Sequence, residues 1–321
     1  MKLQRLWLLA AAAAACVGCA EPKGELDVNI GGQKCVTLSV ALPEVETRAN
    51  NDSATSGKSN IDWSKYDLRY QIEVYDANDG TKMAFDRIVD ATNGDNYTKE
   101  ITLTAGRDYK VYVWADFVEE GKRTDLHYNT GDFAAITYKD GVKVNDESRD
   151  AYCGSATILK TQTGVTLNLT RPMGKLRVVT TDAKKLSFGQ EPDNVVFSCA
   201  SLPAGYNLKA GELLSATTSA NAEASIVEYG NEASREKLTL LAAYLFGGDT
   251  TTIQFSLTSK DDTAEIYTMV VNTDIPVKPN KLTTLKGATL TSTANIECTI
   301  VDGITGEIEY EQDGSGNWVE K

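Results

Sequence analysis

The functional group whose chemistry is most evident from this sequence is the thiol of Cys19. It follows a short basic leader, an apolar run from Leu6 to Ala15 and the small residues Val17-Gly18. This order is typical of a bacterial lipoprotein signal peptide, residues 1–18, that is removed before a cysteine whose thiol is then acylated. The apolar run is much shorter than the ~20 residues that a spanning helix needs. Cys16 is the alternative acceptor, but Gly18 at the preceding position favours Cys19.

A second site of covalent chemistry is the peptide bond between Arg48 and Ala49. Arg48 follows a strand-like segment that ends at Pro43, and a polar stretch from Asn50 to Asn60 comes after it. Proteases cleave most readily in exposed polar segments of this kind. A protease could therefore reach Arg48 easily.

The strand-like segment before Arg48 has four alternating apolar residues: Val36, Leu38, Val40 and Leu42. Alternation at this period places all four on one face of a strand. Burial of each is worth ~1.5–3 kcal/mol, so loss of the strand would remove ~6–12 kcal/mol from a fold whose net stability is typically ~5–15 kcal/mol. A cut domain would then need a replacement strand.

Residues that could support catalysis are few. The only histidine is His127, in a polar segment, and the sequence contains no GxSxG, HExxH, P-loop or dinucleotide motif. Asp116 and Glu119 are the type of carboxylate pair that a glycosidase uses, although nothing in the pattern singles them out. We predict that the chain is not an enzyme and has no catalytic residue.

The pattern of possible ligands predicts no metal site and no cofactor. Near the C-terminus, Asp313, Ser315 and Asn317 alternate as at the start of a calcium loop, but Trp318 replaces the glycine that such a loop requires. A turn is the better interpretation. The remaining cysteines show no clustered spacing, so we expect scattered buried thiols at Cys35, Cys153, Cys199 and Cys298.

Composition is that of an exported, acidic protein. The 321-residue chain has a formal net charge of −13, which argues against nucleic-acid binding because it would repel a phosphate backbone. Short alternating segments separated by glycine-containing turns run through most of the sequence, which predicts an all-β fold of β-sandwiches. A loop with one short helix is expected only between Gly211 and Lys237. The sequence from Arg171 to Gly174 interrupts the strand pattern.

These features predict four parts of the chain. Residues 1–18 are the signal peptide, and residues 19–60 are a lipidated N-terminal segment with the first strand and the processing site. Residues 61–170 form an N-terminal β-sandwich domain. Residues 171–321 form a C-terminal β-sandwich domain with terminal strands.

Several segments together resemble fimbrillin-like lipoproteins of Bacteroidales, of the DUF6562 type. They are the lipoprotein leader, Arg48 after a first strand, RYQIEVY from Arg69, YKVYVWADF from Tyr109, RPMGKLRVVT from Arg171 and IPVKPNKLTTLKGATL from Ile275. The resemblance implies two tandem transthyretin-like (Greek-key) β-sandwich domains and acylation of Cys19. It also implies cleavage between Arg48 and Ala49 by a trypsin-like protease, and polymerisation when a strand of another subunit replaces the first strand.

Two C-terminal segments alternate as a donor strand should: Ile296, Cys298 and Ile300 in one, and Ile304, Ile308 and Tyr310, with a gap at Gly306, in the other. An ordinary edge hairpin of the second domain would explain the same alternation, and the sequence leaves both interpretations open.

The leading functional hypothesis is a cell-surface fimbrial subunit that acts in the stalk, at the anchor or at the tip, and assembles by proteolysis-triggered strand exchange. Its partners would be other fimbrial subunits or further copies of itself, the outer membrane through the lipid, and a host or bacterial surface ligand. The alternative is a monomeric outer-membrane lipoprotein that binds glycans for nutrient uptake. It would require an exposed aromatic platform and an uncut Arg48. A secreted hydrolase is a third, more distant hypothesis.

Overall fold

The computed structural model describes residues 32–43, 61–81, 83–93, 97–186, 192–226, 238–261, 264–291, 297–302, 306–312 and 318–320. Within these ranges the regular structure is β-strand, apart from two short 3-10 helices at Glu147–Arg149 and Ala183–Lys185. The prediction of an all-β fold is therefore confirmed. No helix in the described part of the chain is long and apolar enough to cross a membrane.

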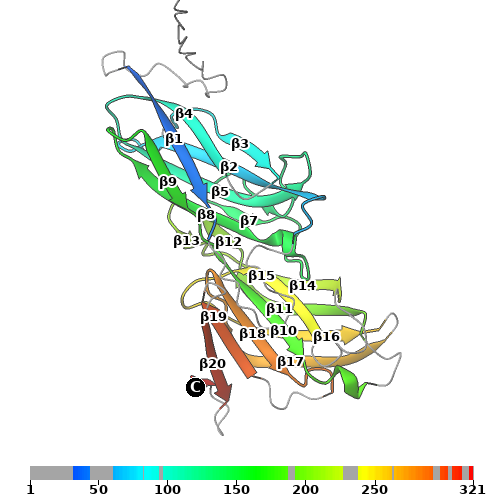
Figure 1. Cartoon of the computed structure of the whole chain (residues 1–321). Coiled ribbons are helices and arrows are strands. Elements are labelled where there is room, and N and C mark those ends of the chain that lie inside the picture. The colour runs from blue at the N-terminus through cyan, green and yellow to red at the C-terminus, as the bar shows by residue number, and fades with distance from the viewer. Residues whose placement is uncertain are drawn as a thin grey trace, which may run out of the picture.

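The first sandwich consists of a three-stranded and a four-stranded sheet (Figure 1). Their orders are β4-β1-β9 and β3-β2-β5-β8. In the three-stranded sheet β1 pairs antiparallel with β4 and parallel with β9. The strands are β1 (Gln33–Ala41), β2 (Tyr66–Asp76), β3 (Ile88–Thr92), β4 (Tyr97–Thr104), β5 (Tyr109–Glu119), β8 (Ala151–Ile158) and β9 (Gly164–Asn168).

The second sandwich repeats this arrangement with a longer first sheet, β15-β10-β18-β19-β20-β21, and a second sheet, β14-β11-β16-β17. Here β10 pairs antiparallel with β15 and parallel with β18, as β1 does with β4 and β9. The strands are β10 (Met173–Thr180), β11 (Asn194–Pro203), β14 (Thr217–Ser225), β15 (Leu238–Phe246), β16 (Thr252–Lys260), β17 (Glu265–Pro276), β18 (Lys281–Gly287), β19 (Glu297–Asp302), β20 (Gly306–Gln312) and β21 (Trp318–Glu320). The chain thus contains two transthyretin-like sandwiches of the same strand order.

A small sheet of order β13-β12-β7-β6 links the two sandwiches. Its strands are β6 (Tyr128–Asn129), β7 (Ile136–Tyr138), β12 (Gly205–Asn207) and β13 (Glu212–Leu213). Because β7 pairs with β12, a segment that precedes β10 is hydrogen-bonded to one that follows β11. The two sandwiches are therefore connected by hydrogen bonds between β7 and β12 as well as by the covalent chain.

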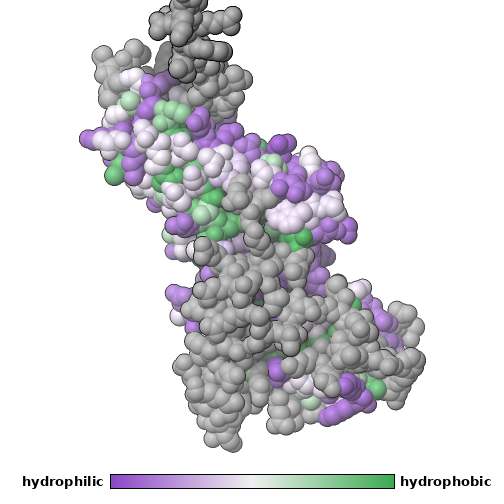
Figure 2. Space-filling model, in the orientation of Figure 1, coloured by the Kyte–Doolittle hydropathy of each residue, from purple (hydrophilic) through white to green (hydrophobic). Residues whose placement is uncertain are grey.

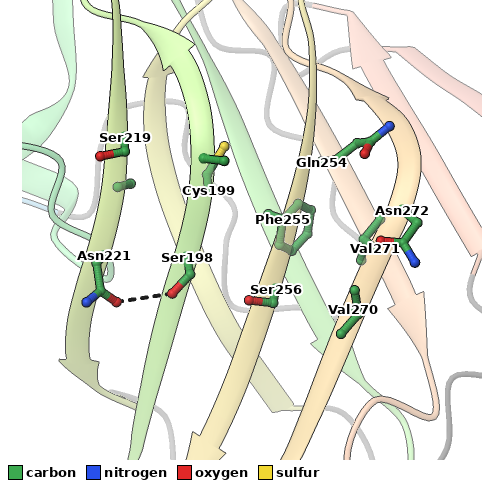
Figure 3. A pocket seen from close by; sticks show the side chains of 12 residues that line it. Ser198, Cys199, Ser219, Asn221, Gln254, Phe255, Ser256, Val270, Val271 and Asn272 are labelled. Carbon is green, nitrogen blue, oxygen red and sulfur yellow. Dashed lines mark hydrogen bonds between the residues drawn. The ribbon is translucent and has the colours of Figure 1, made fainter.

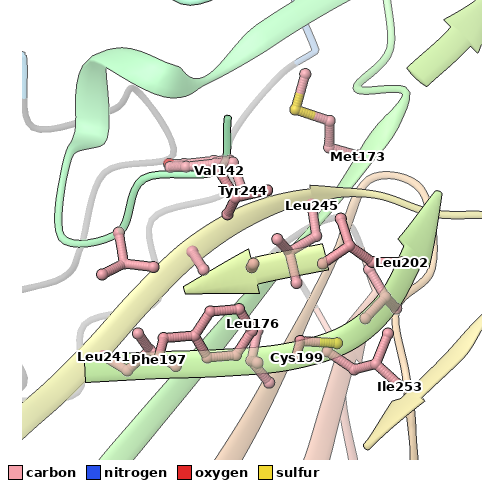
Figure 4. Packing of buried hydrophobic residues seen from close by; sticks show 14 of the residues in the cluster. Val142, Met173, Leu176, Phe197, Cys199, Leu202, Leu241, Tyr244, Leu245 and Ile253 are labelled. Atoms are coloured by element: carbon pink, nitrogen blue, oxygen red, sulfur yellow. The ribbon is translucent and has the colours of Figure 1, made fainter. Parts of the chain in front are cut away.

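Two apolar clusters fill the molecule. One lies between the sheets of the first sandwich and includes Val36, Tyr70 and Val111. The larger one fills the second sandwich and extends to Trp114 of β5. Figure 4 shows part of this larger cluster. Since alternate residues of β5 belong to the two clusters, this strand is buried on both faces, which explains its nearly continuous apolar sequence.

The expectation of a loop with one short helix between Gly211 and Lys237 is wrong for the described residues of that segment, because β14 occupies Thr217–Ser225. Ala220 and Ala222 are buried on one face, while Ser219 and Asn221 lie on the other. Alanine has a high intrinsic helix propensity, so alternation of small residues gave no visible strand signal. Pairing with β11 determines the conformation instead.

Candidate functional site

β1 is the central strand of its sheet, although it is the first strand among the described residues (Figure 1). Eight of its residues pair with β4 and five with β9. The Thr37 N–H donates to the carbonyl of Thr163 at 2.9 Å, and the Ala41 carbonyl accepts from the Leu169 N–H at 2.8 Å. Removal of β1 would therefore leave a groove with a strand on each side, whose backbone groups face inward unpaired.

The inward face of β1 is apolar, as its alternation predicted. Val36 and Leu38 are 0% exposed and Val40 is 5% exposed. Leu42 lies just beyond the end of the strand and is half-buried against the same cluster. Cys35, which we expected to be buried, is exposed because it lies on the opposite face of β1.

The sheet opposite β1 forms the floor of this groove. Tyr70 of β2 stacks on Tyr97 of β4, with ring centroids 4.4 Å apart and an interplanar angle of 12°. The Tyr97 hydroxyl donates to Asp90 at 2.6 Å, so its polar end is satisfied while its ring stays in the core. The other fully buried side chains on this floor come from β2 and β5 and include Leu68, Ile72, Val74, Val111, Val113 and Ala115.

Contacts at the start of β1 fix its register. The Gly32 carbonyl accepts from the Ala105 N–H at 2.7 Å, and the Lys34 ammonium donates to the Leu159 carbonyl at 2.9 Å. Burial lowers the pKa of Lys34, against the opposing effect of Asp108. These contacts hold β1 non-covalently at the end that is further from Arg48.

The residues proposed for processing lie outside the described part of the chain. These are Cys16, Cys19, Arg48 and Ala49. Ile296 and Ile304 of the candidate donor segments also lie outside it.

The described residues of the candidate donor segments belong to β19 and β20, which lie with β21 at one edge of the longer sheet of the second sandwich. β19 pairs antiparallel with β18, β20 with β19, and β21 with β20. In this register Ile308 is opposite Ile300 and Tyr310 is opposite Cys298. Cys298 and Ile300 are only 3% and 6% exposed, so β19 contributes to the core of its own sandwich.

His127 is buried and has a hydrogen-bonded partner. Its Nε2 atom lies 2.7 Å from the Ser148 hydroxyl, which itself donates to the Asp146 carboxylate at 2.5 Å. Since the only hydroxyl proton is directed at Asp146, Nε2 must donate to Ser148. A catalytic histidine would instead accept the serine proton and hold the carboxylate on its other nitrogen. The direction of these hydrogen bonds does not support a hydrolase.

Replacement of His127 by Gln should change the pH dependence of stability. Burial lowers the pKa of His127 to about 4, despite the raising effect of Asp146. Between this value and the ordinary ~6.5 the unfolded chain binds more protons than the folded one, so stability falls as the pH falls. Urea denaturation at pH 7 and pH 4 should show a decrease in the wild type that exceeds that of H127Q by on the order of 2–3 kcal/mol. Equal decreases would show that His127 is not held neutral.

Asp116 and Glu119 do not form a carboxylate pair. Glu119 is exposed, whereas Asp116 is 0% exposed and binds Arg69 at 2.7 Å. Arg69 also contacts Asp125 at 2.9 Å. This buried cluster was missed in the sequence, because the hydrogen-bonded partners lie on different strands and only their register brings them together.

A shallow hollow lies on the outer face of the sheet β14-β11-β16-β17 (Figure 3). The neutral side chains of Ser198, Asn221, Gln254 and Asn272 line it, with Val270 exposed beside them. The aromatic side chains that the structure describes are all buried or half-buried, including those of β5. The aromatic platform that glycan binding would require is thus missing from the described residues. Among the described residues, no group of three or more His, Cys, Asp or Glu side chains could hold a metal ion.

Solved structures similar to this chain were found. A candidate cell adhesion protein from Bacteroides ovatus aligns over 84% of this chain and 97% of its own, with 16% identity and a TM-score of 0.52. A fimbrial assembly protein from Parabacteroides distasonis aligns over 90% of this chain and 100% of its own, with 14% identity and a TM-score of 0.43. A candidate polysaccharide-binding protein from Bacteroides thetaiotaomicron aligns over 88% and 100%, with 10% identity and a TM-score of 0.47. At such identities we take from the first of these only its fold.

Comparison of the sequence with curated proteins found no match. A protein-family model, described as a family of unknown function (DUF6562), matches residues 29–317. The match begins before β1 and extends beyond β20, so it includes both sandwiches and the groove. The chain therefore belongs to the DUF6562 family, as its sequence resemblance predicted.

Proposed function

We propose that this protein is a subunit of a cell-surface fimbria and that β1 is the strand that another subunit replaces. The observation that carries the proposal is the place of β1, the first described strand, at the centre of a sheet between β4 and β9. Cleavage of the Arg48-Ala49 bond would leave β1 joined to the body by non-covalent contacts alone. The vacated groove would accept a strand with three alternating apolar residues.

The proposal also assigns the protein to the outer membrane. Acylation of Cys19 would anchor the precursor, and the anchor would be lost from the body when the peptide up to Arg48 leaves. A subunit that is never cut would keep β1 and its lipid and would serve as the anchor. A cut subunit would serve in the stalk or at the tip, where it could contact a host or bacterial surface ligand.

The C-terminal strands are the proposed donors. β20 is favoured over β19, since Cys298 and Ile300 of β19 are buried in their own sandwich. Ile304, Ile308 and Tyr310, which share one face with a gap at Gly306, would then enter the groove of the next subunit. Such a chain of contacts is head-to-tail, so it produces an open polymer.

A monomeric glycan-binding lipoprotein is the second candidate function. The hollow beside Asn221 and Gln254 favours it, because amide groups can hydrogen-bond to sugar hydroxyls. This function requires neither cleavage at Arg48 nor strand exchange.

Treatment of the wild type with a trypsin-like protease should produce ladders of assemblies that resist SDS. Arg48→Ala should produce no ladder, because its first strand stays covalently attached. Truncation after Asp302, which removes β20 and β21 but keeps β19, should also abolish the ladder without preventing cleavage at Arg48. Circular dichroism must show that the truncated chain keeps its β structure. Gel electrophoresis and mass spectrometry provide the readout.

Two results separate the alternatives. A ladder that persists after truncation at Asp302 but disappears after truncation at Thr293 would identify β19 as the donor. A wild-type chain that is verifiably cut, has released β1 and still migrates as a monomer would contradict self-assembly and favour the glycan-binding function.

A further inference from the structure

A buried amide and a buried hydroxyl meet where the segment between β5 and β7 packs on β2. Hydrophilic residues are common on the visible surface of the first sandwich (Figure 2), but Gln71 and Thr130 are only 3% and 1% exposed. The Gln71 Nε2 atom donates to the Thr130 hydroxyl at 2.5 Å. Tyr70 and Ile72, the neighbours of Gln71 on β2, point into the core beneath β1, so Gln71 points to the opposite face of its sheet. The contact therefore lies outside the groove.

The Thr130 hydroxyl directs its own proton at a carboxylate. Its Oγ1 atom donates to Oδ1 of Asp125 at 2.6 Å, and the Thr130 N–H donates to Oδ2 at 3.0 Å. Burial raises the pKa of Asp125, but hydrogen bonds from Thr130 and from the Arg69 guanidinium outweigh this effect and lower the pKa below its ordinary value. Asp125 is therefore ionised at neutral pH and can accept the hydroxyl proton. A hydroxyl with such a partner is a potential nucleophile.

A guanidinium lies at the oxygen of the amide. Arg87 donates from Nη1 to the Gln71 Oε1 atom at 3.3 Å and to the Thr130 carbonyl at 2.6 Å. Its Nη2 donates to the Gly131 carbonyl at 3.0 Å, and its Nε donates to Glu73 at 2.9 Å. These contacts fix the guanidinium in place before any reaction begins. A fixed cation at this oxygen stabilises the negative charge that develops there when the amide carbon is attacked.

We propose that the chain forms an ester bond between Thr130 and Gln71, with release of ammonia. Thr130 Oγ1 attacks Cδ of Gln71 while Asp125 accepts the hydroxyl proton, and negative charge develops on Oε1 beside Arg87. The bond between Cδ and Nε2 then breaks, and the proton held by Asp125 passes to the leaving nitrogen. One C–O bond replaces one C–N bond, Asp125 returns to its ionised form, and the products are the ester and one molecule of ammonia. The step needs neither an oxidant nor a co-reactant.

Burial favours the ester in two ways. The fold holds the hydroxyl and the amide in contact, which replaces a bimolecular encounter by an intramolecular one of high effective concentration. Hydrolysis of the ester would require water at the bond, and both residues are almost fully withdrawn from solvent. The ammonia, in contrast, is lost to bulk solvent, where dilution opposes the reverse reaction.

An ester here would tie β2 covalently to the segment that leads from β6 into β7. Because β7 pairs with β12, this segment belongs to the small sheet that links the two sandwiches. The bond would close a loop from residue 71 to residue 130, which lowers the conformational entropy of the unfolded chain. It involves neither Arg48 nor the groove nor the C-terminal strands, so it is independent of the proposed strand exchange.

The intact mass of the full chain tests the bond, with Arg48→Ala in every variant so that the chain stays whole. This parent should be lighter than its sequence mass by about 17 Da, the mass of the ammonia that is lost. Thr130→Val should have its full sequence mass, and Thr130→Ser, which keeps a hydroxyl, should show the loss again. Asp125→Asn removes the proton acceptor and should slow the mass loss on the order of 10²–10⁴-fold, followed with time after synthesis.

Thr137→Val is the matched control. Asn129 donates from Nδ2 to the Thr137 hydroxyl at 3.1 Å, so the same two kinds of group meet there, but at a solvent-exposed position. This variant should keep the mass loss of the parent. After tryptic digestion, residues 70–82 and 124–139 should be recovered as one joined pair of peptides from the parent and as separate peptides from Thr130→Val.

Two results would overturn the proposal. One is a parent chain that has its full sequence mass although its circular dichroism shows the expected β structure. The other is a mass loss that persists in Thr130→Val, which would place the modification elsewhere in the chain. Circular dichroism spectra equal to that of the parent confirm that each variant is folded.

Discussion

Replacement of Leu38 by Asp should destabilise the first sandwich more than any other single substitution in β1. Leu38 is 0% exposed at the middle of the strand, between Lys99 of β4 and Val165 of β9 in the register. Loss of a buried leucine side chain costs ~2–5 kcal/mol, and a buried carboxylate without a partner adds to this cost. We therefore expect the free energy of unfolding to decrease by at least ~4 kcal/mol.

Ser39→Asp is the control for this prediction. Ser39 is the next residue of β1, is half-buried and lies on the opposite face. Its replacement should cost less than ~1 kcal/mol, as is usual for substitutions away from a core. Urea denaturation of the uncut chain measures both values. Equal effects of the two substitutions would mean that the inward face of β1 contributes little, which would leave no reason for the groove to require an apolar donor.

Replacement of Arg171 by Met should have the second large effect. Arg171 lies between the two sandwiches, where its Nε donates to Asp150 at 2.8 Å and its Nη1 to Asn280 at 3.3 Å. Asp150 is 0% exposed and also accepts from the Tyr152 hydroxyl at 2.7 Å. Removal of one partner from a buried ion pair leaves an uncompensated charge and costs ~3–5 kcal/mol. We expect R171M to lose this amount of stability.

A more exposed ion pair nearby supplies the comparison for R171M. Lys175 binds Glu147 at 2.6 Å, and the two side chains are 22% and 31% exposed. Because solvent screens such a pair, Lys175→Met should cost no more than ~1 kcal/mol. Urea denaturation again provides the measurement. An R171M variant as stable as K175M would show that Arg171 is not needed to neutralise Asp150.

The sequence was most informative where neighbouring residues determine the structure. Alternation alone predicted that Val36, Leu38 and Val40 share a buried face, and the structure agrees. Alternating segments along the rest of the chain also predicted the all-β fold, which the structure shows. Leu42 alternates equally well but lies beyond the end of β1, since pairing with β9 ends at Ala41.

Features that depend on distant pairing could not be predicted in this way. No local pattern indicates that β1 lies between β4 and β9, or that Arg69 reaches Asp116. The sequence pattern did not predict β14, because its buried residues are alanines. The position of Cys35 on the outer face of β1 follows from the same alternation that buries Val36, so in that case the signal was present and was not used.

The central claim is that the assembled protein lacks its own β1. N-terminal sequencing and intact mass measurement of the subunits in SDS-resistant assemblies recovered from cells test it most directly. The account predicts that stalk subunits begin at Ala49 and have lost the peptide that contains β1. Subunits that begin with an acylated Cys19 throughout such assemblies, with residues 33–41 still present, would contradict it.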